Sequence, residues 1–270
     1  MLAVGPRLWG DEERSDVATK SADILATKSR VVDEMKRLGS QLPPVLVVTN
    51  PVEPIVTWLW RRTGLAPNRL FGLGATVDSA RFSLHIGSRL DVSARSAWTT
   101  LVGEHGPGVL AAGHGRLAGI VPPIELERAE KRALVLAKKD ARIIRKLTEQ
   151  VAIDRAGKLV RELEATVGCV LDKEKRKTVA ERLAQEIAPP ATRFAIAAAV
   201  TEIGRAIHAD ERRVMTVSSS APAQWGLAAV ALALPFRIGK GAVGSCLLAS
   251  PPGGLADIAD NIEQIANTLP

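Results

Sequence analysis

The sequence contains no tyrosine, and aromatic residues together make up only 3% of its 270 residues. The core must therefore be built from aliphatic side chains. Cysteine is also scarce: Cys169 and Cys246 lie far apart and fit neither a disulfide framework nor the spacing of a zinc site. No apolar run reaches the roughly 18 residues that a membrane-spanning helix needs. These absences predict a globular protein with no metal and no membrane partner.

The charged residues are not gathered into a block of one sign. Lys and Arg number 36 against 29 Asp and Glu, a formal net charge of +7, and the two signs are interspersed. Nucleic-acid-binding proteins more often collect their basic residues on one motif, so we expect no nucleic-acid partner. The first residues, MLAVGPRLWGDEER, turn acidic early, which is not typical of a secretory signal peptide. A cytoplasmic location is the default expectation.

Three short phrases each place polar groups at the end of an apolar segment: VLVVTNPVE (Val45–Glu53), GLGATVDSARF (Gly72–Phe82) and VGEHG (Val102–Gly106). They supply the amide of Asn50, the carboxylate of Asp78, the guanidinium of Arg81 and the imidazole of His105. In open α/β sheets, ligands gather beyond the carboxyl ends of the strands. This set of groups could move a proton on a substrate that carries a carboxylate.

Each of these features also has a plainer interpretation. Asn50 precedes a proline, a pair that favours a simple turn. Asp78 and Arg81 are three positions apart, so they could form a surface ion pair of little energetic worth. His105 is the one histidine of four that falls inside a motif. The functional interpretation gains weight because all three phrases occur in one chain.

In order and spacing, the three phrases resemble the active-site segments of the NAD-dependent lactate/malate dehydrogenase family. The resemblance is strongest between Val45 and Gly106, fades in the middle of the chain and returns around Thr192–Pro235. It implies an oxidoreductase that interconverts a 2-hydroxy acid and a 2-keto acid with NAD and forms a homo-oligomer. The roles that it implies are His105 as acid/base, Asp78 as its partner, Arg7, Arg14, Asn50, Arg81 and Thr192 as substrate contacts, and Gly5, Val48 and Asn50 as cofactor contacts.

The resemblance favours malate over lactate. Arg7, Arg14 and Arg81 together provide cationic groups for two carboxylates, whereas a lactate-type site would more often place a neutral residue in the loop. The expected substrate pair is therefore malate and oxaloacetate.

Hydrophobic periodicity and turn signals indicate an α/β fold. The resemblance implies the particular architecture: a truncated Rossmann-type parallel sheet over residues 1–75, the remaining half of the NAD-binding domain, followed by an α+β substrate domain of the lactate/malate dehydrogenase type over residues 76–270. The expected helices are Asp16–Leu38, Ile55–Arg62, one opening at VDSARF, a charged helical stretch over Ile124–Ile187, Arg193–His208 and Asn261–Leu269. The expected strands are Val45–Val48, Leu70–Leu73, Val214–Ser218 and Ala228–Leu234.

A dinucleotide-binding fold normally opens with a strand, a G-x-G-x-x-G turn and a helix, and nothing of that kind precedes Leu2. The literal match at Gly239–Gly244 lies between expected antiparallel strands, so we interpret it as a hairpin turn. Three explanations remain open: a fragment of an ordinary dehydrogenase, a homologue that no longer binds NAD and acts by protein association, or a short form completed by another chain. The first is favoured because the active-site phrases are intact.

Overall fold

The computed structural model describes residues 32–97, 99–106, 108–111, 122–168, 170–187, 192–227 and 229–269. The chain divides into two compact units, which we describe separately: Met1–Ala137 with Ala198–Pro270, and Lys138–Ala197. The domain boundary at residue 75 that the sequence suggests stays a prediction. Of the helix expected over Asp16–Leu38, residues 32–38 are helical and the rest lies outside the described residues.

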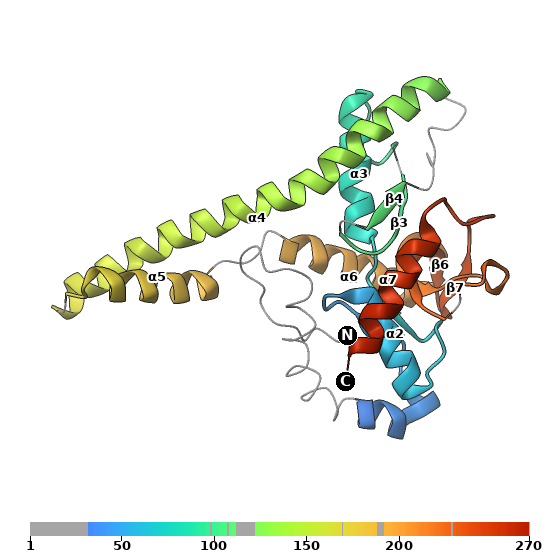
Figure 1. The fold of residues 1–270 in the computed structure, drawn as a ribbon, viewed down its shortest axis with the longest axis horizontal. Helices are drawn as coiled ribbons and strands as arrows, with labels where there is room; N and C mark the ends of the chain where they lie inside the picture. Colours follow the sequence, from blue (N-terminus) through green and yellow to red (C-terminus); the bar gives the residue numbers. More distant parts are fainter. Residues whose placement is uncertain are drawn as a thin grey trace. The chain divides into compact units, whose positions relative to one another are not determined.

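The first unit is built on one mixed sheet (Figure 1). Strands β1 (Val45–Val47) and β2 (Leu70–Gly72) run parallel, as expected of the remaining part of a Rossmann-type sheet. From β2 the sheet continues antiparallel through β5 (Arg213–Ser220), β6 (Ala231–Gly239), β3 (Leu101–Gly103) and β4 (Val109–Ala111). Strand β7 (Ala242–Cys246) pairs with β6 across a tight turn, which is the hairpin expected at the G-x-G-x-x-G sequence. The chain thus has the predicted mixed α/β fold.

Glycine allows the parallel and antiparallel parts of the sheet to meet. Strands β2 and β5 are joined by one residue pair, Gly72 with Ser218. A Cβ atom at Gly72 would lie 2.4 Å from Cγ1 of Val52 and 3.0 Å from Cβ of Ser218, closer than packed atoms allow. Only glycine therefore lets the end of β2 approach both its neighbouring strand and the helix that follows β1.

Helix α2 (Val52–Thr63) packs its apolar face on the parallel strands. It ends at Gly64, whose left-handed conformation directs its N–H to the carbonyl oxygen of Trp60. Arg61 donates hydrogen bonds to Glu263 and Asn267 of α7 (Leu255–Thr268), which lies beside α2 in Figure 1. The buried cluster beneath this pair of helices includes Val47, Ile55, Leu59, Leu70 and Leu269.

Helix α3 (Thr76–Arg89) covers a second apolar cluster together with the start of α4 (Pro123–Val167). Phe82 and Ile86 of α3 pack there against Leu101 of β3 and Leu126 of α4, all of them fully or almost fully buried. This cluster holds α3 against the strand that leads to His105. Helix α6 (Thr192–His208) precedes β5, and its residues from Ala198 onward belong to this unit. The short 3-10 turns Gly39–Gln41 and Ala223–Trp225 also belong to it.

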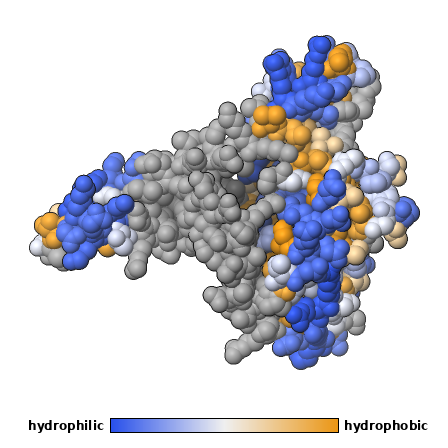
Figure 2. All heavy atoms as spheres, viewed as in Figure 1, coloured by the Kyte–Doolittle hydropathy of each residue, from blue (hydrophilic) through white to orange (hydrophobic). Residues whose placement is uncertain are grey.

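The second unit is a helical hairpin of the C-terminal part of α4 and α5 (Lys173–Ile187). Both helices lie in the charged stretch in which the periodicity predicts helix. The guanidinium of Arg176 contacts the Glu164 carboxylate at 3.0 Å, and that carboxylate also accepts the backbone N–H of Leu171 at 2.7 Å. Figure 2 shows the tip of this hairpin as largely hydrophilic with a few apolar patches.

None of the described helices, α4 included, is both long enough and apolar enough to cross a bilayer.

Candidate active site

Asp78 lies in the first turn of α3, where exposed backbone N–H groups favour a negative charge. The helix begins directly after β2 and the Gly74–Ala75 turn, so its first turn stands at the carboxyl end of a parallel strand. The hydroxyl of Thr76 donates to the carbonyl oxygen of Thr216 on β5 at 2.8 Å. This bond fixes the start of the helix on the sheet, and with it the position of Asp78.

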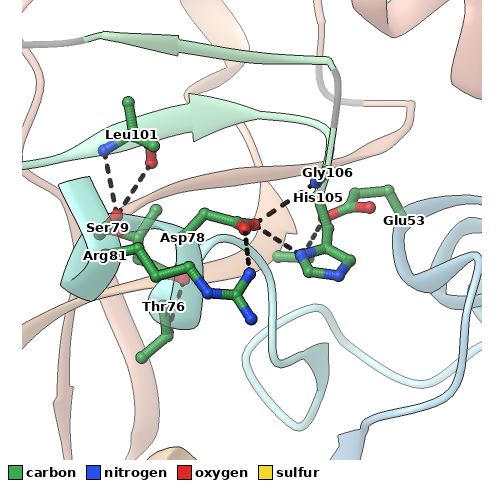
Figure 3. A network of polar contacts seen from close by, with 10 residues as sticks. Glu53, Thr76, Asp78, Ser79, Arg81, Leu101, His105 and Gly106 are labelled. Atoms are coloured by element: carbon green, nitrogen blue, oxygen red, sulfur yellow. Dashed lines mark hydrogen bonds and ion pairs between the residues drawn. The ribbon is translucent and has the colours of Figure 1, made fainter. Parts of the chain in front are cut away.

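Two serine hydroxyls attach α3 to the segment before His105. Ser79 Oγ accepts the N–H of Leu101 at 3.0 Å (Figure 3), and Ser83 Oγ accepts the N–H of Thr99 at 3.1 Å. All four residues are buried, so these hydrogen bonds replace bonds to water that the buried groups cannot make. The separation of helix and strand is therefore set by specific bonds as well as by apolar packing.

His105 follows β3 and contacts Asp78 directly. Its Nδ1 lies 2.6 Å from Oδ2 of Asp78, and the N–H of Gly106 donates to the same oxygen at 3.4 Å (Figure 3). Gly103, with φ of +106°, is needed here, because a Cβ atom would lie 2.8 Å from the Gly108 carbonyl oxygen. The Asp78 carboxylate is bonded to Nδ1 of His105. The His105 side chain is 28% exposed, and Nε2 is the ring nitrogen that remains available to a substrate.

Arg81 lies one turn after Asp78 on the same helix, with Nη1 3.5 Å from Oδ1 of Asp78. Figure 3 shows its guanidinium and the His105 imidazole both next to the Asp78 carboxylate. The guanidinium is a planar fork that suits a carboxylate ligand. A cation, a base and a buried anion thus meet at one place.

The two partners shift each other's pKa in opposite directions. Burial raises the pKa of Asp78, but the hydrogen bond and charge of His105, the charge of Arg81 and the N–H of Gly106 outweigh it, so the pKa lies below its usual value. Burial lowers the pKa of His105, but the hydrogen bond and charge of Asp78, with the charge of Glu53, leave it above its usual value. The pair therefore favours an ionised carboxylate beside a protonated imidazole.

Two further buried carboxyl groups lie close to this pair, and sequence reasoning gave neither of them a role. Glu53 in the first turn of α2 is 1% exposed and accepts a hydrogen bond from Oγ of Ser218 on β5 at 2.7 Å. Glu104, which precedes His105, is 3% exposed and accepts a hydrogen bond from Nδ2 of Asn261 on α7 at 3.4 Å. Both residues belong to the three phrases that carry the site, and that position was the only sign in the sequence that they lie near it.

The structure brings together three of the residues expected in the site: His105, Asp78 and Arg81. Val48 and Asn50 follow the carboxyl end of β1; Asn50 is exposed, and its amide makes no hydrogen bond within the described part of the chain. Thr192 opens α6, although its side chain is not described. Gly5, Arg7 and Arg14, like Cys169, lie outside the described residues. Their roles, and that of Thr192, stay predictions.

Across the described ranges, no group of three or more His, Cys, Asp or Glu side chains could hold a metal ion.

Comparisons with known proteins agree with the family resemblance that the three phrases carry. L-lactate dehydrogenase of Allorhizobium ampelinum is 27% identical over 243 residues, 90% of this chain and 67% of the relative. L-lactate dehydrogenase of Clostridium perfringens is 28% identical over 242 residues, 88% of this chain and 63% of the relative. The chain thus spans about two thirds of the length of these curated relatives. No family model matches.

Solved structures show the same fold. A minor L-lactate dehydrogenase from Enterococcus mundtii in its ligands-bound form superposes with a TM-score of 0.69 and 20% identity over 99% of this chain and 74% of that chain. The malate dehydrogenase from Aeropyrum pernix gives a TM-score of 0.62 and 17% identity over 98% of this chain and 74% of that chain. The fold is therefore the Rossmann-like fold of these dehydrogenases. By sequence and by fold, the chain is similar to lactate and malate dehydrogenases, which confirms the resemblance.

Proposed function

We propose that this chain interconverts a 2-hydroxy acid and a 2-keto acid with NAD. The observation that carries the proposal is the 2.6 Å contact between His105 and a buried Asp78, with the Arg81 guanidinium beside it. An imidazole paired with a carboxylate is suited to hold a proton near neutral pH. The adjacent guanidinium gives the same site an affinity for a carboxylate. No described feature favours the alternative in which the chain acts only by protein association.

In the direction of oxidation, Nε2 of His105 accepts the proton of the substrate hydroxyl. In the direction of reduction, the same nitrogen returns a proton to the carbonyl oxygen. Asp78 holds the Nδ1–H tautomer and stabilises the imidazolium once it forms, as carboxylates paired with histidine do generally. The bonds of Ser79 and Ser83 to the backbone before His105 keep this geometry in place.

Arg81 binds the substrate carboxylate through two parallel N–H donors, a geometry that lysine cannot copy. Arg14 would polarise the substrate carbonyl, Asn50 would orient the substrate, and Arg7 and Thr192 would complete its contacts. With these groups in place, the substrate oxygen faces Nε2 of His105.

The cofactor assignment fits the described part of the fold. Val48 and Asn50 lie just past the carboxyl end of β1, the edge at which ligands bind in parallel sheets. These two residues, with Gly5, would hold NAD, which when bound exchanges a hydride with the substrate carbon. The assembly expected is a homo-oligomer, and the location expected is the cytoplasm.

The pH dependence of the two reaction directions should differ in sign. Reduction needs a protonated His105, so its kcat/KM should fall as pH rises through the His105 pKa. Oxidation needs a neutral His105, so its kcat/KM should rise over the same interval. Because the His105 pKa is raised, both midpoints should lie above the ordinary histidine value of about 6.5. Initial rates in each direction between pH 5 and pH 9, a range on the order of two units on either side of neutrality, measure this; midpoints below 6.5 would contradict the site geometry.

The experiment that tests the proposed function is titration of the 270-residue chain with NADH by calorimetry. Micromolar binding, about −8 kcal/mol, followed by turnover of a 2-keto acid, is the expected result. Absence of both would overturn the proposal for this chain. For the substrate, kcat/KM should be higher with oxaloacetate than with pyruvate, because Arg7, Arg14 and Arg81 offer cations for two carboxylates. A preference for pyruvate would replace malate with lactate as the favoured substrate.

A further inference from the structure

Glu53 is a buried carboxyl group to which the mechanism above gives no task. It is 1% exposed, and its Oε1 accepts a hydrogen bond from the Ser218 hydroxyl at 2.7 Å. Removing a carboxyl group from water is costly unless it is hydrogen-bonded or paired with a charge. The hydroxyl of Ser218 meets part of this cost, and a nearby cation would meet more of it.

The nearby cation is the imidazole of His105. Figure 3 shows Glu53 reaching the neighbourhood of His105 from α2, whereas Asp78 reaches the imidazole from α3. Two carboxyl groups on separate helices therefore lie near one histidine. Among the described residues, the other charged groups around them are Arg81, which contacts Asp78 from α3, and the buried Glu104, which precedes His105 and is bonded to Asn261 of α7.

The electrostatic effects of Glu53 and His105 are reciprocal. Burial raises the pKa of Glu53, and the charge of Glu104 adds to this, while the charge of His105 and the hydrogen bond from Ser218 act in the opposite direction. The charge of Glu53 in turn acts on His105 in the same direction as Asp78, and Arg81 acts against both. A protonated His105 and an ionised Glu53 each make the other more favourable.

We propose that Glu53, held in place by Ser218, is a second acidic partner of His105 and a positioning residue for its proton transfer. Asp78 fixes the imidazole through a direct hydrogen bond, and Glu53 stabilises its protonated form from a second side. The inference rests on the proposed function only where it gives His105 the acid/base role.

A purely structural role for Glu53 and the proposed electrostatic role predict different effects of Glu53→Gln on the pKa of His105. The hydrogen bond from Ser218 could equally be accepted by the amide oxygen of glutamine. Glu53→Gln therefore keeps the link between α2 and β5 and removes only the charge. Thr57→Val is the matched control: Thr57 is buried one turn later on α2, and its hydroxyl oxygen links the helix to the sheet by accepting the N–H of Ala231 at 2.9 Å.

The test is an NMR titration of the His105 ring in the full 270-residue chain, without substrate or cofactor. The His105 signals are identified by their absence from His105→Asn. In Glu53→Gln the pKa of His105 should fall by about one pH unit, the usual effect of losing one nearby opposite charge. In Thr57→Val it should stay at the value of the unchanged chain.

An unchanged His105 pKa in folded Glu53→Gln would overturn the proposal, as would an equal fall in Thr57→Val. If Glu53→Gln does not fold, Ser218→Ala decides the question, because it removes the donor that favours ionised Glu53. A smaller fall in the His105 pKa would support the proposal, and no change would overturn it. The titration needs neither NAD nor substrate. A chain without dehydrogenase activity would therefore contradict the proposed function, and the titration would still test the effect of Glu53 on the His105 pKa.

Discussion

A chain carrying His105→Asn should turn over its 2-keto acid substrate about 10²- to 10⁴-fold more slowly, the usual contribution of a positioned acid/base. Asparagine can still bond to Asp78 through its amide N–H, so the fold and the carboxylate should keep their places. It cannot take up or release a proton near neutral pH. The loss should therefore fall on kcat, with a smaller effect on the KM for the substrate.

The matched control for this prediction is His208→Asn. His208 is exposed in the last turn of α6, so the same substitution there removes a histidine without touching the candidate site. Steady-state kcat and circular dichroism of both variants complete the experiment. Near-normal turnover by His105→Asn would remove this histidine from the mechanism.

Asp78→Asn should produce the second large effect, lowering kcat by about 10²-fold or more. The neutral amide cannot stabilise the imidazolium, and it can present its N–H₂ to Nδ1, which would favour the wrong tautomer. The pKa of His105 should also fall, and by more than in Glu53→Gln, because Asp78 bonds to the ring at 2.6 Å. Kinetics and the same NMR titration measure the two effects independently.

Asp257→Asn is the control for the Asp78 variant. Asp257 also lies in the first turn of a helix, α7, but is exposed. It therefore reports what the loss of a helix N-terminal carboxylate costs by itself. If both substitutions lowered kcat equally, Asp78 would have only the general role of stabilising its helix.

The sequence predicted the elements that carry the site because their signals are local. The buried run at Val45–Val48 and the Leu70–Leu73 run became β1 and β2, and the VDSARF phrase became the opening of α3. Each combines an apolar run with a following turn signal, and those two properties are readable from neighbouring residues. The spacing of Asp78 and Arg81 on one helix face follows from helix geometry alone.

The parts that were missed depend on distant residues or on short elements. Strands β3 and β4 have three residues each, too few to show an alternating pattern. The strand expected over Ala228–Leu234 is β6, which begins at Ala231 and continues through Pro235 to Gly239.

Glu53 was not predicted as a site residue, both because of where its helix begins and because its partner is distant in the sequence. Helix α2 begins at Val52 rather than at the expected Ile55, which puts Glu53 inside the helix. Its partner Ser218 is 165 positions away along the chain, and no local pattern reports such a contact. Burial of a single carboxyl group is a property of the assembled fold, so its chemical role could be inferred only from the structure.

The single-pair junction between β2 and β5 also bears on how this protein would lose activity. Eight residue pairs connect β5 with β6, whereas Gly72 and Ser218 alone connect β5 with β2. Across that seam, the backbone ladder contributes one residue pair, and the hydroxyl groups of Thr76 and Ser218 add side-chain hydrogen bonds. Sub-global opening there would separate Glu53 from Ser218 while leaving the β5–β6 amides protected from hydrogen exchange. In mild denaturant, catalysis should therefore disappear before the antiparallel sheet unfolds.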